Sequence, residues 1–354
     1  MQLSEPGRWP VVLQWVVLIV GGIALGLGME RMHVPAELLL GPLVWAALLG
    51  LRRMTVRIPR WAHQFGQAVA GVLIALNLDP SILTRTMEIW PVVLVFVFLT
   101  LLLACVVGLV ATYLTGLDRD VAVWGFMPGM AGTMIALAHD RGLDSRMVAF
   151  IQILRLLMVI GAMVAFGSVV VGAAVPHSVI NPEQTIWWIV PTLLLIFLGV
   201  ATGRWLPIIP AGASLMPILV GGVLSVNGVA FSVPHWLVAV AFFCLGAQTG
   251  LRFTPDLLKT GARVLPMLVL SVVVLLLLCA VSGAFLSLIA GTDLMTAVLA
   301  TVPGSIDSIA LIALSTGSDI SFIMALQTTR LFAVVVLGPP MAQAILLLFR
   351  RMRV

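Results

Sequence analysis

The sequence predicts an all-α integral membrane protein made of two inverted-topology repeats, each with five transmembrane helices and one re-entrant hairpin. This gives about ten spans and two hairpins. Composition is the first observation, since 61% of the 354 residues are hydrophobic and 9% are charged, against about 25% charged residues in soluble domains. The second is a series of apolar runs long enough to cross about 30 Å of hydrocarbon. The third is an internal repeat.

Each repeat contains six apolar segments. The first, behind Arg8, is interpreted as a retained helix, because it is long and lacks a clear small-residue cleavage site. The fifth is short and is interrupted in the middle by Pro128-Gly129, and by Pro303-Gly304 in the second copy. Proline removes a backbone donor and glycine permits positive φ, so this segment is predicted to be a re-entrant hairpin. The first six segments are expected at about 11–29, 35–51, 61–78, 91–114, 120–139 and 147–173.

The repeat appears when the sequence is shifted by 175 positions. All six prolines between Pro35 and Pro128 then fall on prolines, and Gln152 and Arg155 fall on Gln327 and Arg330. Shared hydrophobicity alone would not align prolines and charges in this way. We therefore expect an N-terminal repeat at 1–175 and a C-terminal repeat at 176–354.

The distribution of basic residues predicts how the repeats are inserted. If the hairpins return to their own side and the N-terminus is cytoplasmic, fifteen of the nineteen basic residues fall inside and two outside, with Arg155 and Arg330 within spans. The loop from Arg52 to Arg60 is basic, whereas its equivalent, from Asn227 to His235, has no lysine or arginine. Five crossings per repeat therefore predict oppositely oriented halves, in a multi-pass protein of the bacterial inner membrane with both termini cytoplasmic.

The hairpin tips are the predicted substrate region, because irregular backbone at membrane depth is tolerated only where protein buries it or where it lines a wet cavity. Free amides and a helix N-terminus at such a tip favour an anion. The alternative is that the two tips are packing kinks. The candidate residues at the tips are Pro128, Gly129, Thr133, Pro303, Gly304, Ser305 and Ser308.

Three charged residues inside apolar segments are further candidates, because a charge at that depth is costly and is functional by default. Arg155 and Arg330 lie in the last span of each repeat, each with a glutamine one helical turn earlier, Gln152 and Gln327. They are expected to bind substrate or to hold the adjacent hairpin by hydrogen bonds to its carbonyls. Asp307 has Gly132 as its counterpart, and could neutralise an arginine or take up a proton or cation. Together the three give a centre of net charge +1, which favours an anionic substrate.

Other chemistry is not expected. The three cysteines have no CxxC spacing and the five histidines no ligand spacing, so neither a metal site nor a cofactor is predicted. The sequence has no nucleotide-binding GxxxxGK[ST] loop and no constellation of nucleophile, base and acid. We expect neither an enzyme nor a nucleic-acid partner. The expected partners are a small-molecule solute, a coupling cation or proton, the lipid bilayer and a second copy in a homodimer.

The segment PGMAGTMIALAHDRGLDSRMVAFIQILRLLMV and its echo PGSIDSIALIALSTGSDISFIMALQTTRLFAVVV resemble the AbrB family of bacterial membrane proteins, over nearly the whole chain. Its members carry labels such as ammonia monooxygenase or regulator of gene expression, and these residues support neither chemistry. The layout is also similar to the 2-hydroxycarboxylate and glutamate:sodium symporters, whose GGxG hairpin signature is only partly matched by PGMAG and PGSID. The resemblance implies a fold and leaves the substrate open.

Two functions remain open at this point. The first is a secondary transporter that moves a small solute by alternating access, with a hairpin-bearing core moving against a dimerised scaffold. The second is a membrane sensor or regulator of gene expression that uses the same fold without transport.

Overall fold

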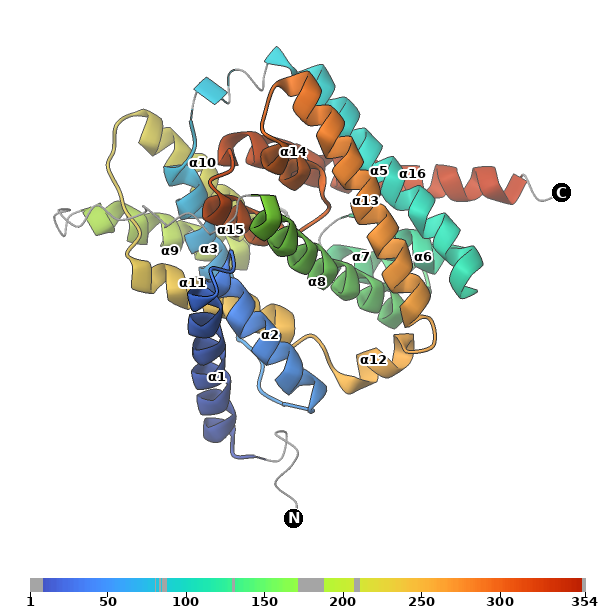
Figure 1. Ribbon diagram of the computed structural model, residues 1–354, viewed down its shortest axis with the longest axis horizontal. Helices are drawn as coiled ribbons and strands as arrows, with labels where there is room; N and C mark the ends of the chain where they lie inside the picture. Colours follow the sequence, from blue (N-terminus) through green and yellow to red (C-terminus); the bar gives the residue numbers. More distant parts are fainter. Residues whose placement is uncertain are drawn as a thin grey trace. The chain divides into compact units, whose positions relative to one another are not determined.

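The computed structural model describes residues 9–79, 81–82, 84, 88–128, 131–170, 188–206 and 211–351. Within these ranges the regular secondary structure is helical and no strand occurs (Figure 1), which confirms the all-α class. The helices are α1 (Val11–Arg31), α2 (Glu37–Leu51), α3 (Arg60–Leu76), α5 (Trp90–Thr115), α6 (Arg119–Phe126), α7 (Ala131–Asp140), α8 (Ser145–Val170), α9 (Ile189–Trp205), α10 (Gly212–Val226), α11 (His235–Gly250), α12 (Pro255–Gly261), α13 (Leu265–Ala290), α14 (Leu294–Thr301), α15 (Ile306–Thr316) and α16 (Ile320–Arg351).

Four of these helices, α1, α5, α8 and α13, are long and apolar enough to cross a membrane. The number rises to six if each of two bent pairs counts as one span: α11 with α12, bent by 50°, and the two parts of α16, bent by 47°. A 21-residue helix such as α1 is about 32 Å long at 1.5 Å per residue, about the thickness of the hydrocarbon core. The chain is thus a membrane protein by the length and composition of its helices.

Helix boundaries recur at the offset of the sequence repeat. The bounds of α2 and α10, of α5 and α13, and of α6 and α14 differ by 175 positions at both ends. The local stop and start signals recur too. Gly116 and Gly291 end α5 and α13 with φ of 70° and 66°, a conformation that favours glycine. Asp118 and Asp293 then accept a backbone amide at the N-termini of α6 and α14.

The chain forms two compact units, each assembled from both halves of the sequence. Unit 1 comprises Met1–Ser81, Val164–Pro255 and Asp307–Ser321. Unit 2 comprises Ile82–Met163, Asp256–Ile306 and Phe322–Val354. The predicted boundary between repeats, at 175 and 176, lies outside the described residues and stays a prediction.

In unit 1, helices pack with their backbones in direct contact. α2 packs against α1 and α11, and α3 packs against α9, α10 and α11. A Cβ added at Gly71 of α3 would lie 2.4 Å from the carbonyl oxygen of Ser214, and one at Gly246 of α11 would lie 2.3 Å from that of Leu39. Gly71 and Gly246 are 175 positions apart, and so are Leu39 and Ser214, so the two contacts are equivalent in the repeat. Only glycine leaves room for such an approach, which is typical of helix packing in membranes.

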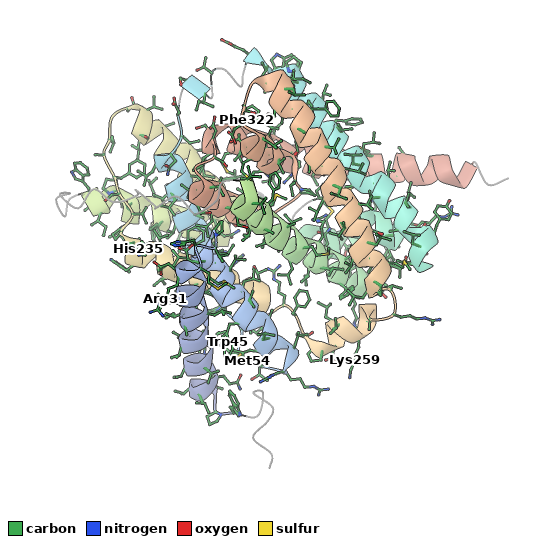
Figure 2. All side chains as sticks on the ribbon, in the orientation of Figure 1. Arg31, Trp45, Met54, His235, Lys259 and Phe322 are labelled. Carbon is green, nitrogen blue, oxygen red and sulfur yellow. The ribbon has the colours of Figure 1, made fainter. Side chains whose placement is uncertain are left out.

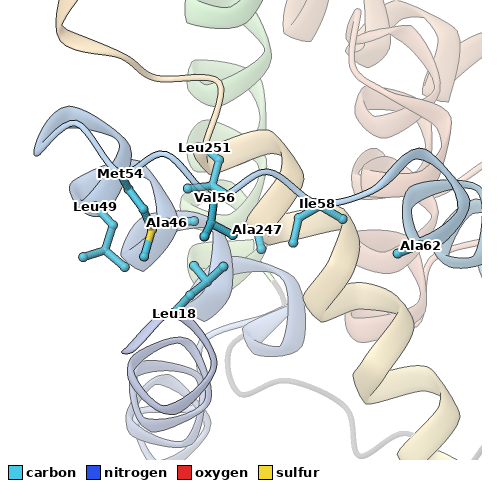
Figure 3. Packing of buried hydrophobic residues seen from close by; sticks show 9 residues of the cluster. All are labelled: Leu18, Ala46, Leu49, Met54, Val56, Ile58, Ala62, Ala247 and Leu251. Atoms are coloured by element: carbon cyan, nitrogen blue, oxygen red, sulfur yellow. The ribbon is translucent and has the colours of Figure 1, made fainter. Parts of the chain in front are cut away.

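An apolar cluster fixes the connection between α2 and α3 (Figure 3). It is made of Leu18, Ala46, Leu49, Met54, Val56, Ile58, Ala62, Ala247 and Leu251. Gln14 of α1 is buried beside it, and its Oε1 accepts from the backbone amides of Thr55 at 3.1 Å and Val56 at 3.2 Å. The indole of Trp45, labelled in Figure 2, donates to the carbonyl of Val17 at 2.9 Å. Two backbone amides of this loop are therefore bound by the Gln14 side chain of α1.

In unit 2, α5 packs against α6 and α13, and α13 packs against α14. Glycines again allow close approach: a Cβ at Gly108 would lie 3.1 Å from the Cα of Val123, and one at Gly283 would lie 2.8 Å from that of Val298. Gly108 and Gly283 are 175 positions apart, and so are Val123 and Val298. The short helices α6 and α14 are thus held against the long helices that precede them.

Candidate functional site

The chain leaves the helical conformation after α6 and again after α14, two short helices of unit 2. α6 ends at Phe126 and α7 begins at Ala131, while α14 ends at Thr301 and α15 begins at Ile306. Pro128 and Pro303 lie in these interruptions, and both are buried. The last carbonyls of α6 and α14 have no partner within their own helix. Because these groups are buried, they need other donors.

Arg155 and Gln152 of α8 supply the donors after α6. The Arg155 Nη1 donates to the carbonyl of Phe126 at 2.7 Å. The Gln152 Nε2 donates to the carbonyls of Met127 at 3.0 Å and Trp124 at 3.2 Å. The two side chains are joined by a hydrogen bond of 2.9 Å from Arg155 Nη2 to Gln152 Oε1. This pair therefore holds the end of α6 in place.

Arg330 and Gln327 of α16 make the equivalent contacts after α14. The Arg330 Nη1 donates to the carbonyl of Val302 at 2.9 Å, and its Nη2 donates to that of Gly304 at 3.4 Å. The Gln327 Nε2 donates to the carbonyl of Leu299 at 2.8 Å. Arg330 Nη2 also donates to Gln327 Oε1. A hydrogen-bonded Arg–Gln pair that binds the carbonyls at the end of a short helix is therefore present twice, 175 positions apart.

The two guanidinium groups are buried together without a carboxylate partner. Arg155 is 5% exposed and Arg330 is 6% exposed. Each lies near Cys279, and Arg155 experiences the charge of Arg330. Within the described part of the chain neither forms an ion pair, and the Nε of Arg155 has no hydrogen-bond partner. Carbonyl dipoles offset part of the cost, but two buried like charges favour the approach of an anion.

Asp307 belongs to unit 1, at the start of α15, and is 6% exposed. Its Oδ2 accepts a hydrogen bond from the Nε2 of Gln67 at 3.2 Å. The hydroxyl of Ser214 lies beside the same carboxyl group. Its Oδ1 is buried with no hydrogen-bond partner among the described residues. The predicted single centre that combines Asp307 with Arg155 and Arg330 stays a prediction.

The remaining predicted site residues lie at or beside the two interruptions. Ser305 is half-buried between α14 and α15, and Ser308 is buried in the first turn of α15. Gly129 lies outside the described residues. Thr133 lies in α7, and its side chain is outside the described part. The hydroxyl of Thr301 donates to the carbonyl of Cys279 at 3.0 Å and joins α14 to α13.

Gln67 and Ser214 were not among the residues that the sequence predicted. The signal that could have found them is a break in the repeat, because their counterparts at the offset of 175 are the apolar residues Phe242 and Leu39. The same criterion singles out Asp307, whose counterpart is Gly132. Polar residues that replace apolar counterparts are therefore a usable sequence signal in this chain.

Comparison with known proteins places these features in a family. A family profile described as "Transition state regulatory protein AbrB" matches residues 38–346. The chain belongs to the AbrB family. Among its relatives, the Escherichia coli (strain K12) protein named "Putative regulator AbrB" is 39% identical over 341 residues, which cover 94% of this chain and 97% of the relative. The "Uncharacterized protein YhjN" of Bacillus subtilis (strain 168) is 26% identical over 300 residues, 79% of this chain and 77% of the relative.

The family match includes both interruptions and all four residues of the Arg–Gln pairs, since it runs from 38 to 346. The arrangement described above is therefore part of the segment by which this chain is recognised as an AbrB protein. The names of the two relatives indicate no substrate. What the AbrB arrangement does must accordingly be argued from its geometry.

Proposed function

We propose that this AbrB-family protein is a secondary transporter of the bacterial inner membrane, which moves a small solute by alternating access. An anion is the favoured class of solute. One observation carries the proposal: two interrupted helices are each held by a buried Arg–Gln pair, and the arginines have no carboxylate partner in the described part of the chain. A structural clamp alone would not need a full charge at this depth, because a neutral amide also donates to carbonyls.

The proposed architecture is a pair of inverted repeats with re-entrant hairpins at α6–α7 and α14–α15. Helix bounds, close glycine contacts and the Arg–Gln hydrogen bonds all recur at an offset of 175. Inverted repeats with broken helices are typical of secondary transporters, in which half-helix N-termini point at anionic groups of the substrate. Within unit 2, α7 would supply such an N-terminus, and Arg155 and Arg330 would add charge.

The proposed substrate-binding groups divide by role. The arginines and glutamines fix the ends of α6 and α14, and the arginines also stabilise the anion. The proline and glycine interruptions leave backbone amides free for the solute. The hydroxyls near the tips would bind its remaining oxygens. These residues are Pro128, Gly129, Thr133, Gln152, Arg155, Pro303, Gly304, Ser305, Ser308, Gln327 and Arg330. No covalent step is assigned, and the protein is not proposed to be an enzyme.

A ligand screen followed by flux measurement tests the proposal. Thermal unfolding of the purified protein is measured with small carboxylates, inorganic anions, amino acids and cations, because a ligand that binds the folded state raises its Tm. A stabilising solute is then supplied to proteoliposomes. We expect uptake that is lost in Arg155→Ala and Arg330→Ala, while both variants still insert. Uptake that is unchanged in both would remove the site assignment.

The alternative is a membrane sensor or regulator without transport. The name of the Escherichia coli relative, "Putative regulator AbrB", favours this alternative. In that case a ligand found by thermal shift would still raise the Tm, but proteoliposomes would not take it up under any gradient. Saturable flux of the same ligand would exclude this alternative.

A further inference from the structure

Three polar side chains of unit 1 converge from helices that are far apart in the sequence. Asp307 lies in the first turn of α15, Gln67 lies within α3, and Ser214 lies in the first turn of α10. The amide of Gln67 donates to Asp307 Oδ2 at 3.2 Å, and Ser214 lies beside the same carboxyl. The equivalent positions of the other repeat hold Phe242, Leu39 and Gly132. The repeated fold is therefore built without polar side chains at these positions, which points to a chemical role for them.

One oxygen of the carboxyl is buried without a hydrogen bond. Asp307 Oδ1 has no hydrogen-bond partner in the described part of the chain, while Oδ2 accepts from Gln67. The hydroxyl of Ser214 donates to the carbonyl of Ala211 at 3.2 Å. An ionised carboxylate can only accept hydrogen bonds, so Oδ1 would carry buried charge without a donor, and a proton on Oδ1 removes that charge.

The absence of a charged partner among the groups that act on the Asp307 carboxyl also favours its protonated form. The groups that act on the carboxyl are Gln67 of α3 and Ser214 of α10, and neither carries a charge. His63, the titratable residue one turn before Gln67 in α3, has Arg252 as its charged neighbour. An ionised carboxylate buried without a cation is costly, and such a group takes up a proton instead.

We propose that Asp307 is a proton-binding site, in which the buried Oδ1 carries the proton and Gln67 donates to Oδ2. The proposal rests on the transport function above for its purpose, because a carboxyl that binds and releases a proton as the protein changes conformation would couple proton movement to solute movement. A proton is favoured over a metal ion because the amide N–H of Gln67 faces the carboxylate. In addition, no cluster of three His, Cys, Asp or Glu side chains occurs among the described residues.

Infrared spectroscopy tests the site without any transported solute. The full-length protein, purified and reconstituted in lipid nanodiscs at neutral pH, should show the carbonyl stretching band of a protonated carboxylic acid, and the band should shift in D₂O. Asp307→Asn should remove this band. Asp293→Asn is the matched control, because Asp293 is an exposed N-cap of α14 and asparagine also caps; it should retain the band. A band that persists in Asp307→Asn, or that is absent from the parent protein, overturns the proposal.

Two further measurements separate a proton from a cation and from transport. Gln67→Leu, which does not alter the carboxyl, should shift the frequency of the band, because the acid loses the hydrogen bond to Oδ2; an unshifted band contradicts the assigned contact. Addition of Na⁺ at constant pH should leave the band unchanged, and its loss would mean a cation site instead. Should proteoliposomes show no flux of any solute, the transport function fails while the infrared result stands. If they do show flux, Asp307→Asn should lose its dependence on a pH gradient.

Discussion

At the residue scale, the two glutamines decide how the arginines are used. Gln152 and Gln327 each bind a carbonyl with their amide and the neighbouring guanidinium with their oxygen. The helix-end carbonyl and the glutamine oxygen together bind both terminal nitrogens of each guanidinium. The orientation of each guanidinium is therefore fixed by contacts within the protein.

Replacing Gln327 tests this role. Gln327→Leu should lower the free energy of unfolding by about 1–3 kcal/mol, because it leaves the carbonyl of Leu299 and one donor of Arg330 without partners. Thr329→Val, on the same helix, is the control, since its hydroxyl donates to the carbonyl of Ala325 one turn earlier in the same helix; its effect should stay within about 0.5 kcal/mol. Denaturant unfolding in detergent measures both. Equal effects would show that Gln327 is ordinary helix packing.

The sequence identified the Arg–Gln pairs because repetition and charge mark them without any structure. It proposed both carbonyl binding and substrate binding for Arg155 and Arg330, and the structure shows the carbonyl contacts. The break in the repeat marks Gln67 in the sequence, but it does not reveal that Gln67 contacts Asp307, which lies 240 positions away. A contact at that separation depends on how α3 and α15 pack, which local patterns do not encode.

At the element scale, helix ends are set by local chemistry, and they were largely predictable. The segment expected at 91–114 is α5, from Trp90 to Thr115, and the interruption expected at Pro128 falls between α6 and α7. Glycine after a helix and aspartate before one are strong signals. The short helix α12 was not predicted, because seven residues with one lysine and one aspartate give no apolar run.

Glycine contacts between helices give the second prediction. Gly71→Ala and Gly246→Ala should each cost about 1–3 kcal/mol or prevent folding, because the new methyl group would meet a backbone carbonyl oxygen that cannot move independently of its helix. Gly28→Ala in α1 has nothing within 4 Å and should be stabilising by about 0.5–1 kcal/mol. The folded yield and Tm in detergent distinguish them. Two neutral variants would mean that α3 does not pack this closely against α10, nor α11 against α2.

At the scale of the whole molecule, the orientation of the two halves is the main prediction that stays open. Arg52 and Asn227 are equivalent positions, both exposed, at the C-caps of α2 and α10. In a variant with Cys105, Cys244 and Cys279 replaced by alanine, Arg52→Cys and Asn227→Cys should react oppositely with a thiol reagent that does not cross the inner membrane. We expect labelling of the cysteine at 227 from the periplasmic side and protection of the one at 52. Labelling of both from one side would show parallel halves and exclude the inverted arrangement.

The polar residue Asp307, whose counterpart in the other repeat is Gly132, has an energetic consequence under the inverted arrangement. If two oppositely inserted halves were chemically identical, exchanging their roles would interconvert the inward-facing and outward-facing states, and the two states would have equal free energy in the absence of gradients. Asp307 removes that equality, because its counterpart is Gly132, which cannot be protonated. Protonation would then stabilise one orientation more than the other. A single carboxyl group would thereby set the relative populations of the two orientations, while the gradients of proton and solute set the direction of net movement.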